Sequence, residues 1–213
     1  MPDLEFDITS HRYSLDGVQI PACTHVLAAM GATPGFQWLS PDELEFYRSR
    51  GHAVHSAVEY AIKGVLDRRT VAQEVKGYLI GWERAVNDLG IEVVTYQGEP
   101  FVEVHLCSRV FGYGVTPDVV ARTAITRDTG VIEIKATSVH APATGIQLAA
   151  QLRAVREVMP EIGQTRIGLR LLQQEPYYDF KLYQERGDDA TWVGLLNSYK
   201  WLKAHKLLKE NLR

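Results

Sequence analysis

Residues 115–136 read VTPDVVARTAITRDTGVIEIKA, two short apolar runs separated by residues that favour turns. Valines follow Asp118 directly, and the second run covers residues 131–136. β-Branched residues favour strands, and the Thr, Asp and Gly residues of segment 126–130 favour a reversal of the chain between the runs. The pattern predicts a β-hairpin whose first strand spans residues 115–123 and whose second strand spans residues 131–136.

Two charged residues interrupt the second predicted strand. Glu133 and Lys135 alternate there with Ile132 and Ile134. Because successive side chains on a strand point to opposite faces, the two charges project together while the two isoleucines pack on the other face. An antiparallel neighbouring strand brings Asp118 alongside the two charges.

These side chains suit a divalent cation. The carboxylates of Asp118 and Glu133, with the backbone carbonyl of Ile134, form the oxygen-rich environment that Mg²⁺ prefers and leave positions for water and a phosphate oxygen. Lys135 beside such a metal orients water or stabilises charge that develops on phosphorus. The alternative is an ordinary ion pair between Glu133 and Lys135 on a solvated face of the sheet.

A helix upstream of the hairpin offers a further ligand. From Gly51, apolar residues recur every three or four positions, which predicts an amphipathic helix. His55 and Glu59 lie four residues apart and therefore share one face of this helix, where a neutral imidazole adds a nitrogen ligand to the carboxylates. Two alternatives remain open: His55 packs in the core, or His52, three residues earlier, is the ligand.

The order Pro117-Asp118, then Glu133-Ile134-Lys135, in apolar strands across a turn, resembles the PD-(D/E)xK nuclease superfamily. The resemblance implies a restriction-endonuclease-like core that binds Mg²⁺ or Mn²⁺ and hydrolyses DNA phosphodiester bonds.

Two flanking segments resemble the RecB-like and phage-type exonucleases of that superfamily. Residues 51–59, GHAVHSAVE, resemble the helix that carries the family's metal-binding histidine, which assigns this role to His55. Gln147 opens the run QLAAQL, which is similar to a helix whose glutamine, and a tyrosine four residues later, face the active site and the DNA. Gln151 occupies the tyrosine position here, so we rank it with Glu59 as a secondary candidate.

The likeness to these exonucleases implies action at DNA ends, on double-stranded ends or single strands, in phage or prophage recombination or repair. It also implies a homo-oligomer and a single-strand annealing protein as partners. Some relatives bind an iron-sulfur cluster through four cysteines, whereas this chain has only Cys23 and Cys107, which we expect to pack as small apolar residues. Three alternatives stay open: a non-catalytic DNA-binding or assembly module, a structure-specific endonuclease, and a small-molecule hydrolase.

The whole pattern predicts an α/β (α+β) fold with a central mixed sheet flanked by helices, in a single domain over residues 1–213. We expect a lead-in segment at 1–50, a nuclease core at 51–183 and a C-terminal helix at 190–213. The lead-in segment, which contains His11, Tyr13 and Pro21, also resembles that of small phage exonucleases of the superfamily. Further predicted helices cover 24–30, 71–89 and 144–159 and one begins at 41; further predicted strands cover 91–95, 100–106, 165–172 and 177–183.

Composition fits an ordinary globular protein, with 46% hydrophobic and 23% charged residues in 213. No stretch approaches the roughly 18 apolar residues of a membrane helix, and we expect a cytoplasmic protein without a membrane partner. The net charge of −3 means that DNA contacts need a local basic surface. Candidates for this surface are Arg48, Arg50, Arg166, Arg170 and the lysines from Lys200 to Lys209, and candidates for stacking on bases are Tyr113, Tyr177, Tyr178 and Trp192.

Overall fold

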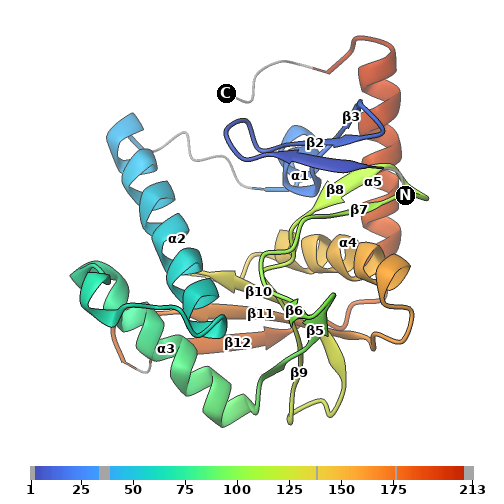
Figure 1. The fold of residues 1–213 in the computed structure, drawn as a ribbon. Helices are drawn as coiled ribbons and strands as arrows, with labels where there is room; N and C mark the ends of the chain where they lie inside the picture. The colour runs from blue at the N-terminus through green and yellow to red at the C-terminus, as the bar shows by residue number, and fades with distance from the viewer. Residues whose placement is uncertain (1–2, 34–38, 138, 176, 209–213) are drawn as a thin grey trace.

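A five-stranded mixed sheet lies at the centre of the computed structural model, which describes residues 3–33, 39–137, 139–175 and 177–208. In sheet order the strands are β12 (Tyr178–Leu182), β11 (Thr165–Leu171), β10 (Thr129–Lys135), β9 (Val119–Arg122) and β4 (Glu92–Val93). β10 and β11 run parallel, and every other neighbouring pair runs antiparallel. The expected α/β fold with a central mixed sheet is therefore confirmed (Figure 1).

Helices cover both faces of this sheet. They are α1 (Cys23–Ala29), α2 (Pro41–Ile62), the single-turn η1 (Arg68–Thr70), α3 (Gln73–Leu89), α4 (Pro142–Val158) and α5 (Gly187–Ala204). α2 and α3 share a buried core with Ile132 and Ile134 of β10, whereas α4 shares a second core with Val131. α1 and α5 pack against α4, so the α4 side is two helical layers deep (Figure 1).

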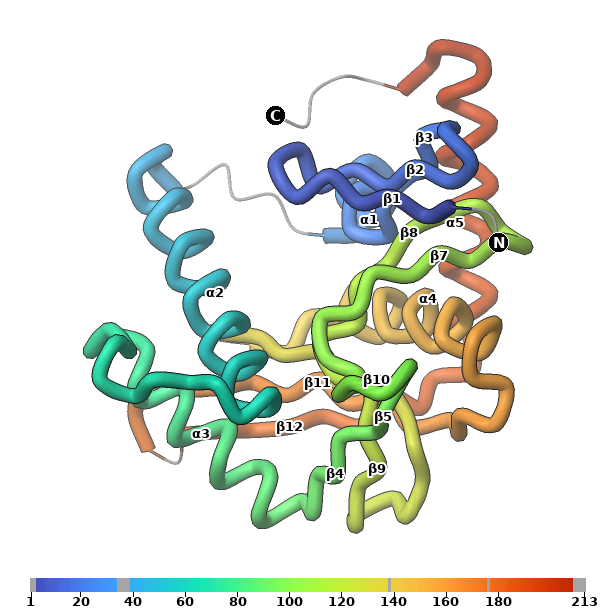
Figure 2. The backbone as a smooth tube through the Cα atoms, in the orientation of Figure 1, coloured from blue at the N-terminus to red at the C-terminus, as the bar shows by residue number. Residues whose placement is uncertain are grey.

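Three small sheets surround the central one. They are the antiparallel β1 (Leu4–Asp7), β2 (Arg12–Leu15) and β3 (Val18–Ile20), the pair β5 (Thr95–Tyr96) and β6 (Glu99–Pro100), and the pair β7 (Leu106–Ser108) and β8 (Tyr113–Val115). Figure 2 traces the β1–β2 hairpin as it crosses over β7 and β8. The ring of Phe6 stacks on that of His105 with 3.9 Å between centroids, so the N-terminal hairpin packs directly on the segment that precedes β7.

The predicted hairpin of residues 115–136 forms, with one change. β9 and β10 pair antiparallel with Val119 opposite Ile132, but the first predicted strand breaks into β8 and β9 at residues 116–118. The N–H of Ile134 donates to the side chain of Asp118 at 2.5 Å, which ends the backbone ladder. Residues 116–118, which precede β9, are therefore not part of the central sheet.

The predicted strand over residues 100–106 is wrong. β6 ends at Pro100 and β7 begins at Leu106, and between them only Val102 makes an isolated bridge, to Val119. The backbone of Glu103 has a φ of 51°, which is incompatible with an extended strand. This segment is instead an irregular connection that crosses the end of β9.

α2 starts where the sequence predicts. The hydroxyl of Ser40 accepts the backbone N–H of Glu43, the Glu43 carboxylate accepts the backbone N–H of Ser40, and Pro41 occupies the first turn. The helix continues through Gly51 to Ile62, so the helices predicted from 41 and from 51 are one element. α2 thus passes through the position where we placed the boundary between lead-in and core.

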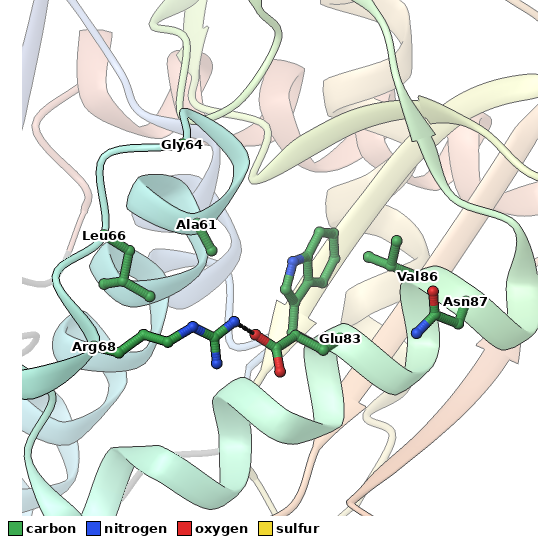
Figure 3. Close-up of a pocket in the computed structure, with 8 residues that line it drawn as sticks. Ala61, Gly64, Leu66, Arg68, Glu83, Val86 and Asn87 are labelled. Carbon is green, nitrogen blue, oxygen red and sulfur yellow. Dashed lines mark hydrogen bonds and ion pairs between the residues drawn. The ribbon is translucent and has the colours of Figure 1, made fainter.

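A hollow of about 540 Å³ lies between the C-terminal end of α2 and α3 (Figure 3). An ion pair between Arg68 and Glu83 crosses it, and no residue that the sequence analysis singled out for the site lines it. Cys23 and Cys107 are buried and unpaired, as expected. Within the described ranges, no helix is both long and apolar enough to cross a membrane.

Candidate metal centre

Three ligand-type side chains from separate elements converge at the end of β9. They are His55 of α2, Glu103 of the irregular connection and Asp118 immediately before β9, and their ligand atoms lie within 4.8 Å of one another. The Nδ1 atom of His55 lies 3.0 Å from a carboxylate oxygen of Glu103 and 3.5 Å from Oδ1 of Asp118. One imidazole nitrogen and two carboxylate oxygens are a donor set that suits Mn²⁺ and Mg²⁺.

Asp118 is buried, with 6% of its surface exposed, and two backbone contacts fix its position. Its Oδ2 accepts the N–H of Ile134, which leaves Oδ1 on the side of His55. Its carbonyl oxygen accepts the backbone N–H of Glu103 at 3.1 Å. The two acidic residues are therefore held together by their backbones as well as by the histidine between their side chains.

Glu103 is the member of this cluster that the sequence did not predict. Its positive φ of 51° lies in the left-handed region, where a residue other than glycine, asparagine or aspartate is uncommon. A signal for it was present, because Glu103 separates Val102 from Val104 just as Glu133 separates two isoleucines.

Glu133 lies beside the three clustered side chains and accepts hydrogen bonds from a separate set of donors. Its Oε1 accepts the Lys135 ammonium at 2.6 Å and the Gln147 amide at 2.7 Å, and its Oε2 accepts the Gln151 amide at 2.6 Å. The Lys135 ammonium also donates to Oε1 of Gln147 at 3.3 Å. The structure thus brings all four residues together, and the two glutamines, four apart, face the sheet from α4.

The electrostatics of the centre favour an additional positive charge. Burial raises the pKa of Asp118 well above its usual value, and the charge of Glu133 adds to the rise although His55 opposes it. Burial lowers the pKa of His55, but Asp118 and Glu103 outweigh this effect and raise the pKa to about 9. In the metal-free protein a proton on His55 therefore supplies part of the charge that a divalent cation would supply.

Two other sequence candidates lie outside this cluster. His52 is exposed and its ring centroid is 6.1 Å from that of His11 on the N-terminal hairpin. Glu59 forms an ion pair with Lys63 at 2.6 Å, one turn further along α2. The carbonyl of Ile134 stays a predicted ligand, since the contact that the structure shows for this residue is made by its N–H.

Replacing each histidine with alanine separates the two assignments. We expect His55→Ala to weaken Mn²⁺ binding by at least about tenfold, because it removes the nitrogen ligand. His52→Ala is the matched control and should bind Mn²⁺ like the wild type, since its ring lies next to His11 instead. Calorimetric titration of both variants measures this, and an equal loss of affinity in the two would remove His55 from the site.

Half of the eight residues predicted to contact DNA have protein partners. Arg166 pairs with Asp188 at 2.8 Å and is mostly buried, while Arg50 donates to the carbonyl of Ala136. Lys200 donates to the carbonyl of Phe111. Arg170 lies 3.6 Å from Asp179. The remaining candidates are Arg48, Lys203 and Lys206, which are exposed, and Lys209, which lies outside the described residues.

The proposed stacking residues are corrected in part. Tyr113 and Trp192 are fully buried and pack edge to face in the core with 4.8 Å between ring centroids, so neither ring is available to a base. Tyr177 lies under the guanidinium of Arg84, and the hydroxyl of Tyr178 donates to Asp88. The sequence could not reveal this, because the partners lie far away along the chain.

Comparisons with known proteins assign no family. No protein-family model matches the chain, and no curated protein matches it. Among solved structures, the chain is similar to one described as the crystal structure of SSO0001, with a TM-score of 0.34, 14% sequence identity and 84% of each chain covered. A likeness at this level identifies neither a family nor an activity.

Proposed function

We propose that this protein is a DNA nuclease that depends on Mg²⁺ or Mn²⁺. The observation that carries the proposal is the convergence of His55, Glu103 and Asp118 beside Glu133, whose carboxylate is bonded to Lys135 two residues further along the same strand. A surface ion pair between Glu133 and Lys135 does not account for this arrangement, because Glu133 is only 3% exposed. The arrangement of these residues agrees with the PD-(D/E)xK order, which favours phosphodiester hydrolysis.

His55, Glu103 and Asp118 would hold the metal, with Glu133 as a neighbouring carboxylate. A divalent ion at this place supplies an acidified water and neutralises charge on a phosphate. The fit rests on the donor set and on the raised pKa of Asp118, because burial and the charge of Glu133 outweigh the positive charges of His55 and Lys135 at this carboxylate. Buried carboxylates of this kind are found where metals or other cations bind.

Lys135 would act as a donor and not as a base. Burial lowers its pKa, but Glu133 and Asp118 outweigh burial and raise it, so the ammonium group keeps its proton at neutral pH. A charged donor bound to Glu133 and Gln147 is held in place for a phosphate oxygen or for the attacking water. Gln147 and Gln151 orient Glu133 through its two oxygens.

The test is incubation of the purified protein with end-labelled linear double-stranded DNA in Mn²⁺, Mg²⁺ or EDTA, alongside Glu133→Ala. Release of mononucleotides or short oligonucleotides that requires metal and disappears in the variant supports the proposal. If the wild type releases nothing with either ion, the proposal is contradicted and the non-catalytic binding module becomes the leading alternative. Closed circular DNA in parallel addresses the proposed action at ends, since cleavage of circles shows an endonuclease instead.

Metal affinity should increase with pH. The pKa of His55 is about 9 in the metal-free protein, so below that pH a metal must displace its proton. The apparent affinity for Mn²⁺ should therefore rise by about tenfold per pH unit between roughly pH 6 and pH 8 for one displaced proton. Titrations in buffers with different ionisation enthalpies count the protons released, and a pH-independent affinity would contradict the assignment of His55.

A further inference from the structure

A cavity of about 160 Å³ lies next to Glu133, between the N-terminal hairpin and α4. Gln147 and Gln151 line it, and the amides of both donate to the Glu133 carboxylate, so one side chain separates the cavity from that group. Thr116, which also lines it, stands two residues before Asp118. The cavity is thus a side chamber of the candidate metal centre.

Rings from the hairpin form one wall of this cavity. Phe6, His11 and Tyr13 line it, and the Phe6 and Tyr13 rings lie 4.7 Å apart. The hydroxyl of Tyr13 is fixed by a hydrogen bond of 2.5 Å to Thr116 Oγ1. Gly114 is required opposite it, because a Cβ there would lie 2.2 Å from the Tyr13 ring.

The remaining lining is uncharged. Ala22, Cys23 and Val115 contribute apolar surface, and none of the described residues that line the cavity is a lysine, arginine, aspartate or glutamate. Among the described lining residues there is therefore no lysine or arginine to bind a phosphate and no carboxylate to bind a free cation. Its volume is close to that of the roughly 150 Å³ apolar cavity known to accept a benzene-sized ring, so a single flat ring fits.

Gln151 supplies an acceptor without a partner. Its side chain is 2% exposed, and its Oε1 atom is buried with no hydrogen-bond partner in the described part of the chain. The amide is oriented by its hydrogen bond, since the Gln151 nitrogen donates to Oε2 of Glu133 at 2.6 Å and its Oε1 atom is turned away from that carboxylate. A buried acceptor left without a donor costs stability and points to a ligand that supplies an N–H.

From these features we infer that the cavity binds the base of the nucleotide next to the cleaved bond. This inference rests on the proposed function, because it takes the ligand to be a nucleotide of the DNA that the protein would cleave. A base unpaired at a strand end, or turned out of the stack, would lie against the Phe6 and Tyr13 rings and donate an N–H to Gln151 Oε1. Each of the four bases carries such an N–H on its pairing edge, but a volume that fits a single flat ring favours the one-ring bases, cytosine and thymine.

Two matched ligands test this directly. Wild-type protein with Mn²⁺ is titrated with deoxycytidine monophosphate and with deoxyribose phosphate, which lacks the base, and binding is followed by ligand-observed NMR. In parallel, cleavage of a labelled strand is compared with that of the same strand with an abasic unit at its end. We expect the base to improve both binding and cleavage by on the order of tenfold, the effect of one base stacked on aromatic rings.

Three variants locate the effect. Phe6→Ala removes part of the wall and Ala22→Leu fills the apolar side, and in both the ratio between base-containing and abasic ligands should fall to near one. Phe46→Ala is the matched control, since that ring is 55% exposed on α2 and does not line the cavity. Thermal melts verify that each variant is folded. The two cavity variants change different walls, so if one of them does not fold, the other still tests the inference.

The outcomes distinguish the two proposals. Cleavage of DNA with equal affinity for the two ligands overturns the base-binding cavity and leaves the nuclease. A preference for the base that both cavity variants abolish, in a protein that does not cut DNA, supports the cavity and overturns the nuclease. A preference for the base that survives in Phe6→Ala and Ala22→Leu overturns the cavity as its origin.

Discussion

Asp118→Asn is expected to abolish metal-dependent DNA cleavage and at the same time to raise the melting temperature of the metal-free protein. The loss of activity should exceed about a hundredfold, because removing even an outer partner of a metal ligand costs roughly 10–100-fold. Asparagine keeps an oxygen that accepts the Ile134 N–H, so the local fold is preserved. Mn²⁺ should no longer raise the melting temperature of the variant.

The gain in stability follows from the sign of the pKa shift. Burial and the charge of Glu133 raise the pKa of Asp118 above its unfolded value, so its contribution to stability is present at acid pH and is lost as pH rises through the folded pKa. A neutral asparagine avoids this loss at pH 7. Each kcal/mol gained corresponds to about 2–4 °C for a chain of this size.

Calorimetry or circular dichroism in EDTA between pH 4 and pH 8 measures the difference between Asp118→Asn and wild type, which should widen as pH rises. Asp88→Asn is a suitable control, because that residue bonds to Tyr178 and lies outside the cluster. A variant that melts below the wild type at neutral pH would show that the ionised carboxylate stabilises the metal-free fold.

Lys135→Met should reduce the rate of cleavage by about 10²–10³-fold, the usual effect of removing one preorganised donor from a charged transition state. Binding of Mn²⁺ should change little, because Lys135 is bonded to Glu133 and Gln147 and is not among the three clustered ligands. The expected pattern is a lower kcat at nearly unchanged metal affinity.

The matched control is Lys63→Met, which breaks an ion pair with Glu59 of the same 2.6 Å length on α2. Its cleavage rate should equal that of the wild type, since exposed pairs on a helix contribute little. Single-turnover kinetics with saturating Mn²⁺ make the comparison. If the two lysine variants cleave equally fast, Lys135 has a structural role only.

Much of the candidate site follows from local periodicity in the sequence. The strand period of two places Glu133 and Lys135 on one face, and the antiparallel register brings Asp118 opposite Glu133 once Val119 pairs with Ile132. The helical period likewise places Gln147 and Gln151 on one face. These residues could be placed from the sequence because each lies in a short segment of regular strand or helix.

What the sequence did not reveal depends on irregular backbone and on distant partners. Glu103 lies in a connection that resembles a strand in composition, and only its positive φ and its bond to the Asp118 carbonyl carry it to the cluster. The N-terminal three-stranded sheet is another case, because the contact between Phe6 and His105 joins residues with no shared period. Such contacts are set by tertiary packing.

The left-handed backbone at Glu103 has a consequence for how this protein would evolve. A glycine there would relieve a conformation that costs other residues roughly 1–3 kcal/mol, just as an asparagine at Asp118 would relieve a buried charge. Laboratory selection for thermal stability alone should therefore replace these two acidic residues early and yield more stable proteins that lack the candidate metal centre. Glutamate and aspartate at these positions would be maintained only where selection also acts on what they bind.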